Sequence, residues 1–295
     1  MVLRTLVERH LKLFVRDRWA VFFSLLSILI VLMLFMLFLR EAFVLDADID
    51  GLDRLVHSWI ISGVLMLSTV TVPLGFLGIM IRDIDSGTIN DFLVAPIKRS
   101  HIVLSYLLAA LLIGTAFSTF NLVIGQLYMF IRFGFLLAPL SWLWTLLVIV
   151  LATSLFASLF FFIVTYVKTP NAHGTMQTLV GTLIGFLVGL YVPLGNLGNV
   201  IRNILSALPT LQVASLFRIV YMADPLKDIP WKTLETIPGV PYFMRTRPAF
   251  EHFMGVELEL FGQTLSLGVL IVVVFAWVCL FTALSTLRIA RFKTG

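Results

Sequence analysis

Six long runs of apolar residues constrain the fold of this chain more than any other feature. A helix needs about 20 apolar residues to cross the hydrocarbon core of a bilayer. We place such spans at residues 19–39, 59–81, 102–131, 141–167, 172–192 and 265–287, and expect the long third one to tilt or to break near its outer end. Membrane β-strands alternate in polarity and would not give runs this continuous. The sequence therefore predicts an all-α integral membrane protein with one transmembrane domain over residues 1–295.

The distribution of charge predicts the orientation of these spans. Only 13% of the residues are charged, about half of what soluble domains carry. With the N-terminus inside, the cytoplasmic segments hold twelve Lys and Arg against five acids, as the positive-inside rule requires. We therefore expect a multi-pass protein of the plasma membrane with both termini in the cytoplasm. The net charge of +5 is then an anchoring charge and needs no nucleic-acid partner.

The spans themselves carry no charge, which bears on the class of function. None of the 21 Lys and Arg or 16 Asp and Glu residues falls within the six spans as drawn. Ion-coupled secondary transporters and channels are the alternative from another functional class. They depend on ionisable groups in the membrane, and the uncharged spans therefore disfavour them. A membrane enzyme would need clustered polar ligands. The acidic cluster Asp46, Asp48, Asp50 and Asp53 has no His partner, and we expect no catalytic residue, metal ligand or cofactor in this chain.

Two segments outside the spans are predicted to be helical. Residues 1–18 form an amphipathic helix that lies in the cytoplasmic interface, because apolar and basic side chains alternate at helical spacing. Its apolar face comprises Leu3, Leu6, Val7, Leu11, Phe14 and Val15, and its polar face Arg4, Glu8, Arg9, Lys12 and Arg16. In the extracellular segment 195–263, Pro209 interrupts an apolar periodic stretch. We expect two short helices dipping into the outer leaflet, followed by an external loop.

The segment 82–99 between the second and third spans has an unusual pattern for a connector. Gly87 permits a sharp turn, and Thr88 with Asp91 three residues later has the form of a helix-starting capping pair. Pro96 then ends the helix. The predicted helix of about two turns would present one apolar face to the cytosol, formed by Ile89, Phe92 and Leu93. An exposed apolar face of this kind indicates either a docking site for a partner or a well-capped loop.

This segment resembles the coupling loop of type-2 ATP-binding-cassette (ABC) exporter permeases of the daunorubicin-resistance and multidrug type. The resemblance rests on Arg82-Asp83 with Asp85, on Gly87-Thr88, and on the aliphatic run that ends at Pro96. The order of the interfacial helix, the six spans and the two outer helices is also similar. Two departures are visible. Asn90-Asp91 replaces a Glu-containing stretch, and Leu104-Ser105-Tyr106 stands where the family carries Gly-Lys.

The resemblance implies that this chain is the transmembrane subunit of an ATP-driven exporter and not itself an enzyme. Two copies of a separate ABC ATPase, which bind ATP and Mg, would drive a homodimer of the permease through the coupling helix. The implied contact residues are Arg82, Asp83, Asp85, Gly87, Thr88, Ile89, Asp91, Phe92, Leu93 and Pro96. The first, second and fifth spans would form the pathway, with candidates Ser62, Ser68, Thr69, Gln177 and Thr182.

The chemical class of the cargo follows from the apolar lining of the spans. Uncharged, Phe-rich helices favour an amphipathic drug-like or lipid-like cargo, taken from the cytoplasm or the inner leaflet, over an ion or a sugar. Export of a lipid or a lipid-linked glycan is the closest alternative, because the long outer segment would suit transfer to an external acceptor. Membrane lipid is therefore a partner in either interpretation.

Overall fold

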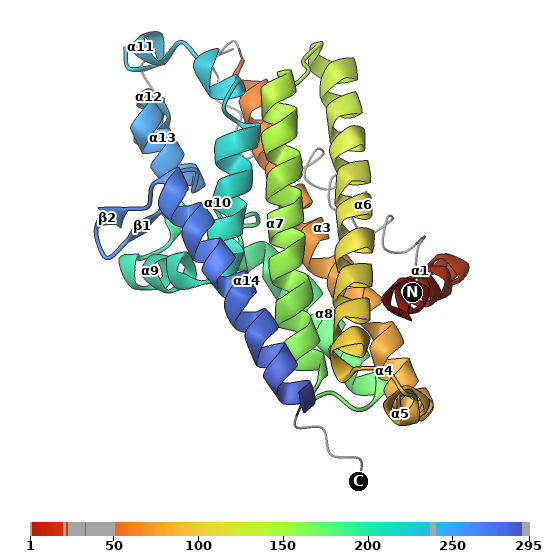
Figure 1. Cartoon of the computed structure of the whole chain (residues 1–295). Helices are drawn as coiled ribbons and strands as arrows, with labels where there is room; N and C mark the ends of the chain where they lie inside the picture. The colour runs from red at the N-terminus through yellow and green to blue at the C-terminus, as the bar shows by residue number, and fades with distance from the viewer. Residues whose placement is uncertain (1, 20–21, 23–32, 34–50, 237–239, 291–295) are drawn as a thin grey trace.

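The computed structural model describes residues 2–19, 22, 33, 51–236 and 240–290. They form a bundle of long helices with shorter helices at both ends and one small hairpin (Figure 1). Most of the expected first span at 19–39 and most of the acidic segment 41–53, including Asp46, Asp48 and Asp50, lie outside the described residues. The helices that the structure does describe confirm the predicted all-α membrane architecture.

Four helical segments of the described chain are long and apolar enough to span a membrane. They are α3 (Leu52–Phe76) continued by α4 (Gly78–Asp85), α6 (Arg99–Phe133), α7 (Pro139–Val164) and α14 (Leu267–Ala290). α6 runs unbroken over 35 residues, so the break considered near its outer end does not occur. At 1.5 Å per residue it is about 52 Å long, which exceeds the hydrocarbon thickness and requires it to tilt or to project from the membrane.

The fifth expected span, 172–192, is a shorter helix than predicted. α8 (Pro170–Leu187) has 18 residues and is not among the four segments above, because its Thr, Gln and His side chains lower its hydropathy. The chain leaves the helix at Gly189, whose φ of 66° lies in the left-handed region. The Leu190 amide donates to the Gly185 carbonyl at 2.9 Å, the bond expected of a glycine-terminated helix.

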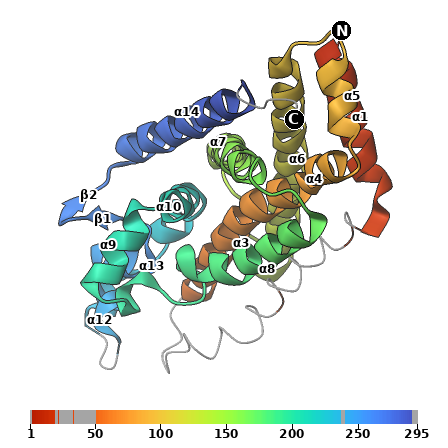
Figure 2. The ribbon, with the colours of Figure 1, turned by 90° about the horizontal axis from the view of Figure 1, so that it is seen from below.

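The centre of the bundle is α3, which packs against α6, α7, α8 and α10 (Figure 2). Small residues allow these helices to approach closely. The Ser68 hydroxyl of α3 lies 2.9 Å from the Ser118 hydroxyl of α6, and a Cβ at Gly125 of α6 would lie 2.8 Å from Ile61 of α3. α14 lies at the periphery, where most of its surface is exposed to the surroundings of the protein.

The two short outer helices predicted around Pro209 are present. α9 (Asn199–Ala207) follows the 3-10 turn η1 (Leu194–Asn196), and α10 (Pro209–Tyr221) begins with Pro209 at its first turn. The two helix axes are bent by 87° relative to each other, so they do not form one straight span. α10 packs on α3, α7 and α14, whereas α9 lies across their direction (Figures 1 and 2).

The segment that follows α10 is folded, whereas the sequence predicted an external loop. Residues 223–264, which we call the outer cap, are described except for 237–239. Their elements are η2 (Pro225–Lys227), α11 (Trp231–Leu234), α12 (Tyr242–Arg245), α13 (Arg247–Met254) and the antiparallel strands β1 (Glu259–Leu260) and β2 (Gln263–Thr264). Phe243 stacks on Phe253 with ring centroids 3.7 Å apart, and Phe250 is buried beside Trp231. The prolines of the outer cap suggested an irregular loop, but aromatic packing orders its turns.

The N-terminal helix α1 (Val2–Arg16) docks on the protein along a narrower stripe than predicted. Its buried side chains are Leu6, His10 and Phe14, which recur every four residues and face α6. Phe14 packs against Phe76 and Phe117. Val15, assigned to the apolar face, is exposed because a stripe with this spacing covers only one side of the helix.

The close crossing of α6, α3 and α7 provides a test of this packing. A Cβ at Gly114 of α6 would lie 2.4 Å from Thr153 and 2.9 Å from the Pro73 ring. Overpacking costs about 1–3 kcal/mol, against the gain of about 1 kcal/mol that Ala has over Gly in a helix. We expect Gly114→Ala to lower the thermal unfolding temperature in detergent. The control Gly181→Ala, where the new Cβ meets nothing within 4 Å, should not lower it.

Candidate coupling site

The short helix predicted between the second and third spans is present at the end of the bundle opposite the outer cap (Figure 1). α5 (Thr88–Val94) follows a turn at Gly87, whose φ of 78° is readily adopted only by glycine. It ends at Ala95, which is extended as expected for a residue that precedes a proline. The glycine and the proline therefore bound the helix as the sequence predicted.

The predicted capping pair of this helix does not form. The residue that caps α5 is Gly87, and no side chain bonds its first amides. The Thr88 hydroxyl lies 2.9 Å from the Ser86 hydroxyl instead, and Asp91 is exposed. The left-handed turn at Gly87 places Thr88 inside the helix, one position too late to act as its cap.

Two of the three predicted apolar anchors of α5 are only half-exposed. Phe92 is half-buried against the bundle, and the Arg9 guanidinium lies over its ring at 5.0 Å from the centroid. Ile89 is also half-buried, and the side chain of Leu93 lies outside what the structure describes. Val94, which the sequence analysis did not select, is 80% exposed. Among the side chains of α5 that the structure describes, the exposed ones are thus Asn90, Asp91 and Val94.

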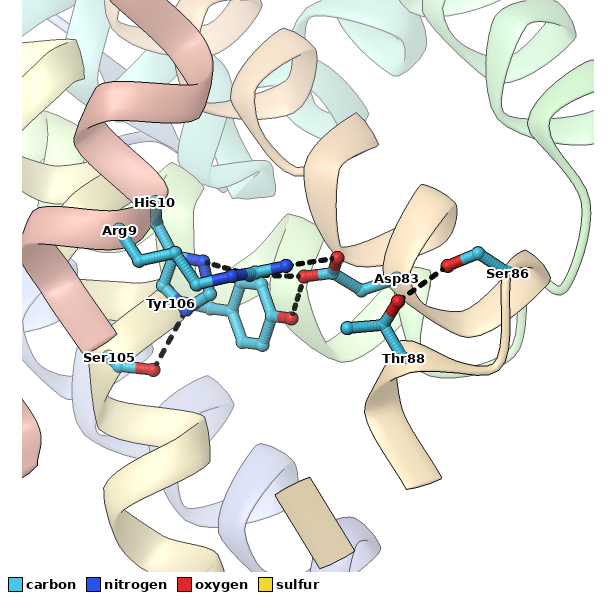
Figure 3. A network of polar contacts seen from close by, with 7 residues as sticks. All are labelled: Arg9, His10, Asp83, Ser86, Thr88, Ser105 and Tyr106. Atoms are coloured by element: carbon cyan, nitrogen blue, oxygen red, sulfur yellow. Dashed lines mark hydrogen bonds and ion pairs between the residues drawn. The ribbon is translucent and has the colours of Figure 1, made fainter. Parts of the chain in front are cut away.

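Asp83, predicted to contact a partner, is instead buried at the junction of α1, α4 and α6 (Figure 3). Two nitrogens of Arg9 donate to its two carboxylate oxygens, each at 2.8 Å. The Tyr106 hydroxyl donates to Oδ2 at 2.5 Å. With both oxygens bonded inside the chain and only 6% of the residue exposed, Asp83 presents little surface to another subunit. Of the other acids in this segment, Asp85 is exposed like Asp91.

His10 extends this network to the start of α6. Its ring stacks on Tyr106 with centroids 4.0 Å apart. Arginine can only donate, so the 3.2 Å contact from Arg9 makes Nδ1 of His10 an acceptor. The ring proton is then on Nε2, which donates to the Ser105 hydroxyl at 3.1 Å, and Ser105 donates in turn to the Ile102 carbonyl. Burial, followed by the charge of Arg9, lowers the pKa of His10 to about 4.

The network fixes the position of α5 relative to the membrane helices. Arg9 contacts Asp83 of α4 and Phe92 of α5 at the same time, so α1 braces both sides of the turn at Gly87. A second ion pair joins Arg82 of α4 to Asp17, beyond the end of α1, at 3.3 Å. We conclude that Arg82 and Asp83 hold α1 in place. The sequence had instead suggested that these two residues contact another subunit.

Four residues of this network were not predicted as site residues: Arg9, His10, Ser105 and Tyr106. Two signals in the sequence could have found them. His10 lies midway between Leu6 and Phe14 at helical spacing, which places it on the buried stripe. Ser105 and Tyr106 are the residues that depart from the pattern of the resembled family, and in the structure they bond His10 and Asp83.

The predicted pathway residues lie in two different environments. Ser62, Ser68 and Thr69 are fully buried in α3, where each hydroxyl donates to a carbonyl of its own helix. Gln177 is half-buried and Thr182 exposed on α8. The structure therefore does not bring the five together on one surface. Among the described residues, no three His, Cys, Asp or Glu side chains are grouped so that they could hold a metal ion.

The order of these elements matches a known protein family. A family model described as ABC-2 type transporter matches residues 1–222, three quarters of the chain. The chain belongs to the ABC-2 type transporter family. Members of this family are transport permeases that normally work with an ABC ATPase subunit. The match includes α1, α5 and the network around Asp83, and it ends at Met222, before the outer cap. No curated protein matches the chain.

The network can be tested through the pair Arg9–Asp83. Loss of Arg9 leaves the buried carboxylate of Asp83 without its partner, at a cost of about 2 kcal/mol, between the values for exposed and fully buried pairs, because Arg9 is 31% exposed. We expect Arg9→Met to lower the free energy of unfolding by that amount, and Arg9→Met with Asp83→Asn to lower it less. The measurement is denaturant unfolding in detergent. Arg4→Met is the matched control, because Arg4 pairs with Glu8 at the exposed surface of the same helix.

A second prediction concerns pH. Unfolded His10 binds a proton below its ordinary pKa of 6.5, whereas folded His10 does so only near 4. The contribution of His10 to the free energy of unfolding is therefore complete above pH 6.5. It decreases by about 3 kcal/mol in total as the pH falls from 6.5 to about 4. Thermal unfolding between pH 4 and pH 7.5 should show a shallower decrease for His10→Gln than for the natural chain. Equal slopes would contradict the buried neutral state of His10.

Proposed function

We propose that the chain is the permease subunit of an ATP-driven exporter that is coupled through α5 to a separate ABC ATPase. Two permease copies and two ATPase copies would form the complex in the plasma membrane, with both termini in the cytoplasm. ATP and Mg would bind on the ATPase, and this chain would supply the membrane path. The family supports a permease with an ATPase partner, and the geometry of α5 supports the site of coupling.

The observation that carries the proposal is the bracing of a short, exposed helix between two spans. A helix that transmits force from a partner must be fixed relative to the membrane helices next to it. α5 is held by the Gly87 turn, by the stacking of Phe92 under Arg9, and by the buried pair Arg9–Asp83 below it. A push on its outer surface would therefore be transmitted to α4, α1 and α6 as one unit.

The surface offered to the ATPase differs from the one that the sequence suggested. Among the described side chains of α5, Val94 is the exposed apolar one, and Asn90 with Asp91 provides polar groups next to it. An apolar anchor with a polar rim is the usual arrangement of an interface centre. In this proposal Phe92 holds α5 to its own chain. ATP-driven closure of two ATPases would bring two α5 helices together and rock the spans between inward-facing and outward-facing states.

We propose an amphipathic drug-like or lipid-like cargo, as in multidrug exporters. The apolar character of the four membrane-spanning segments supports it. Export of a lipid or a lipid-linked glycan is the second candidate. It is favoured by the folded outer cap, which could present such a cargo to an external acceptor. The two are distinguished by which compound stimulates ATP hydrolysis by the purified complex in lipid nanodiscs, an amphipathic dye or a lipid-linked glycan.

The docking surface can be tested at Val94. A carboxylate at the centre of an apolar contact would be buried without a partner, so we expect Val94→Asp to weaken ATPase binding by about tenfold or more. The measurement is co-purification of the ATPase with the tagged permease, together with ATP hydrolysis by the complex.

The controls separate docking from folding. Tyr242→Asp places the same charge on another highly exposed side chain, in the outer cap, and should leave the ATPase bound. Val94→Ile keeps the apolar surface and should also bind. If Val94→Asp retains the ATPase at the natural level, or if no ATPase accompanies the natural chain, the proposed coupling through α5 is wrong.

A further inference from the structure

A second buried charge lies far from α5. Arg218 of α10 is fully buried. Among the described residues, its hydrogen-bond partners are backbone carbonyls and not carboxylates. A guanidinium that is removed from water must be compensated by other polar groups, or it destabilises the fold. Its compensation therefore needs an explanation.

The compensation comes from backbone carbonyls at the ends of two helices. One terminal nitrogen of Arg218 donates to the carbonyls of Val188 and Gly189, at 2.6 and 3.2 Å. The other donates to the carbonyl of Gly255 at 3.3 Å. Val188 is the residue at the C-terminus of α8, and Gly255 is the one at the C-terminus of α13. Both ends present carbonyls without intrahelical partners and the negative pole of the helix dipole, so two helix ends share one cation.

The neighbours of Gly255 are held in the same way. The Trp59 indole of α3 donates to the Met254 carbonyl at 2.9 Å, and the Ser215 hydroxyl of α10 donates to the Val256 carbonyl at 2.7 Å. Arg218 also lies over the Trp59 ring at 5.4 Å. Three consecutive carbonyls of the outer cap are thus bonded by side chains of the bundle. Gly255 has a φ of 69°, and a Cβ there would lie 2.6 Å from Arg218, so the turn is built around the guanidinium.

The opposite end of α8 lies against the segment that leads to α5. His173, in the first turns of α8, is buried, and its Nε2 would be 3.2 Å from a Cβ at Gly78 in α4. α8 therefore contacts the helix next to α5 at one end and is bonded through Arg218 to the outer cap at the other. A rigid helix held at both ends transmits displacement along its length.

We propose that Arg218 is a positioning residue that joins the outer end of α8 to the outer cap, so that the two move as one body during the transport cycle. This inference rests on the proposed function, because it assigns the cap to the parts that move when the ATPases close. The cap is then one of the parts that move during transport, connected to α5 through α4 and α8.

The test is a distance measurement by double electron–electron resonance on the complete permease–ATPase complex in nanodiscs. Cys279, the single cysteine, is replaced by Ala, and spin labels are placed at the exposed positions Leu183 of α8 and Tyr242 of the cap. A reference pair joins Tyr242 to Leu143 of α7. One labelled copy is diluted among unlabelled copies, and spectra are recorded without nucleotide and with ATP and vanadate.

We expect the α8–cap distribution to be narrow and to be the same in both states, while the α7–cap distribution shifts with ATP. Arg218→Met should abolish the narrow α8–cap distribution even without nucleotide. Arg218→Lys is the second variant, for use if Arg218→Met fails to accumulate. It should have the same effect, because one ammonium group cannot replace a guanidinium that reaches both helix ends. Arg202→Met is the matched control, because Arg202 bonds Asn199 within the neighbouring helix α9.

Two results would overturn the inference: an ATP-dependent shift of the α8–cap distance in the natural chain, or a narrow distribution that survives both substitutions of Arg218. Failure of the proposed function is a different outcome. In that case neither pair responds to ATP, and the effect of Arg218→Met without nucleotide still decides whether Arg218 joins α8 to the cap.

Discussion

A charge that leaves water must be compensated inside the protein, and the arrangement of this chain depends on how two such charges are compensated. At one end, the carboxylate of Asp83 is neutralised by Arg9 and hydrogen-bonded by Tyr106. At the other, the guanidinium of Arg218 is neutralised by the carbonyl ends of two helices. Each site joins elements that are distant in sequence. Loss of Arg9 would leave the buried carboxylate of Asp83 uncompensated, and loss of Arg218 would leave the carbonyls of two helix ends without a donor.

The two sites have different physical consequences. The Asp83 site consists of side chains, and its geometry depends on a planar fork meeting a carboxylate, so it orients α1 and α4 in a specific way. The Arg218 site consists mainly of backbone, and it depends on where α8 and α13 end. Between them runs α8, which contacts α4 near its start and Arg218 at its end. The close contact of His173 with Gly78 places α8 directly behind the helix that precedes α5.

In the segment around α5, local sequence patterns predict where the helix begins and ends, but not which of its side chains are buried. Gly87 and Pro96 set the bounds of α5 correctly, because their conformational limits are intrinsic to the residue. The direction of each side chain could not be inferred in the same way. Phe92 lies inward because Arg9 from α1 covers it, and Val94 lies outward because nothing in the described chain reaches it. Burial on a two-turn helix depends on what packs beside it.

The folded outer cap illustrates the same limit in a longer segment. Five prolines between residues 225 and 248 indicate turns, and turns alone resemble a loop. The cap is ordered by aromatic contacts such as Phe243 with Phe253, and by bonds from Trp59, Ser215 and Arg218 in other elements. These contacts join residues separated by tens or hundreds of positions, and no local pattern encodes them.

The sequence by itself determined the helical membrane class, the family, the short helix between two spans and the pair of helices around Pro209. Each of these follows from apolar run length, local conformational preference or a contiguous motif, and such signals are local. Only the tertiary structure decided that Asp83 is an internal anchor, that His10 and Arg9 lie at the base of α5, and that a buried arginine joins α8 to the outer cap. Compensation of a buried charge depends on which groups meet in space, and this is fixed only when the helices pack.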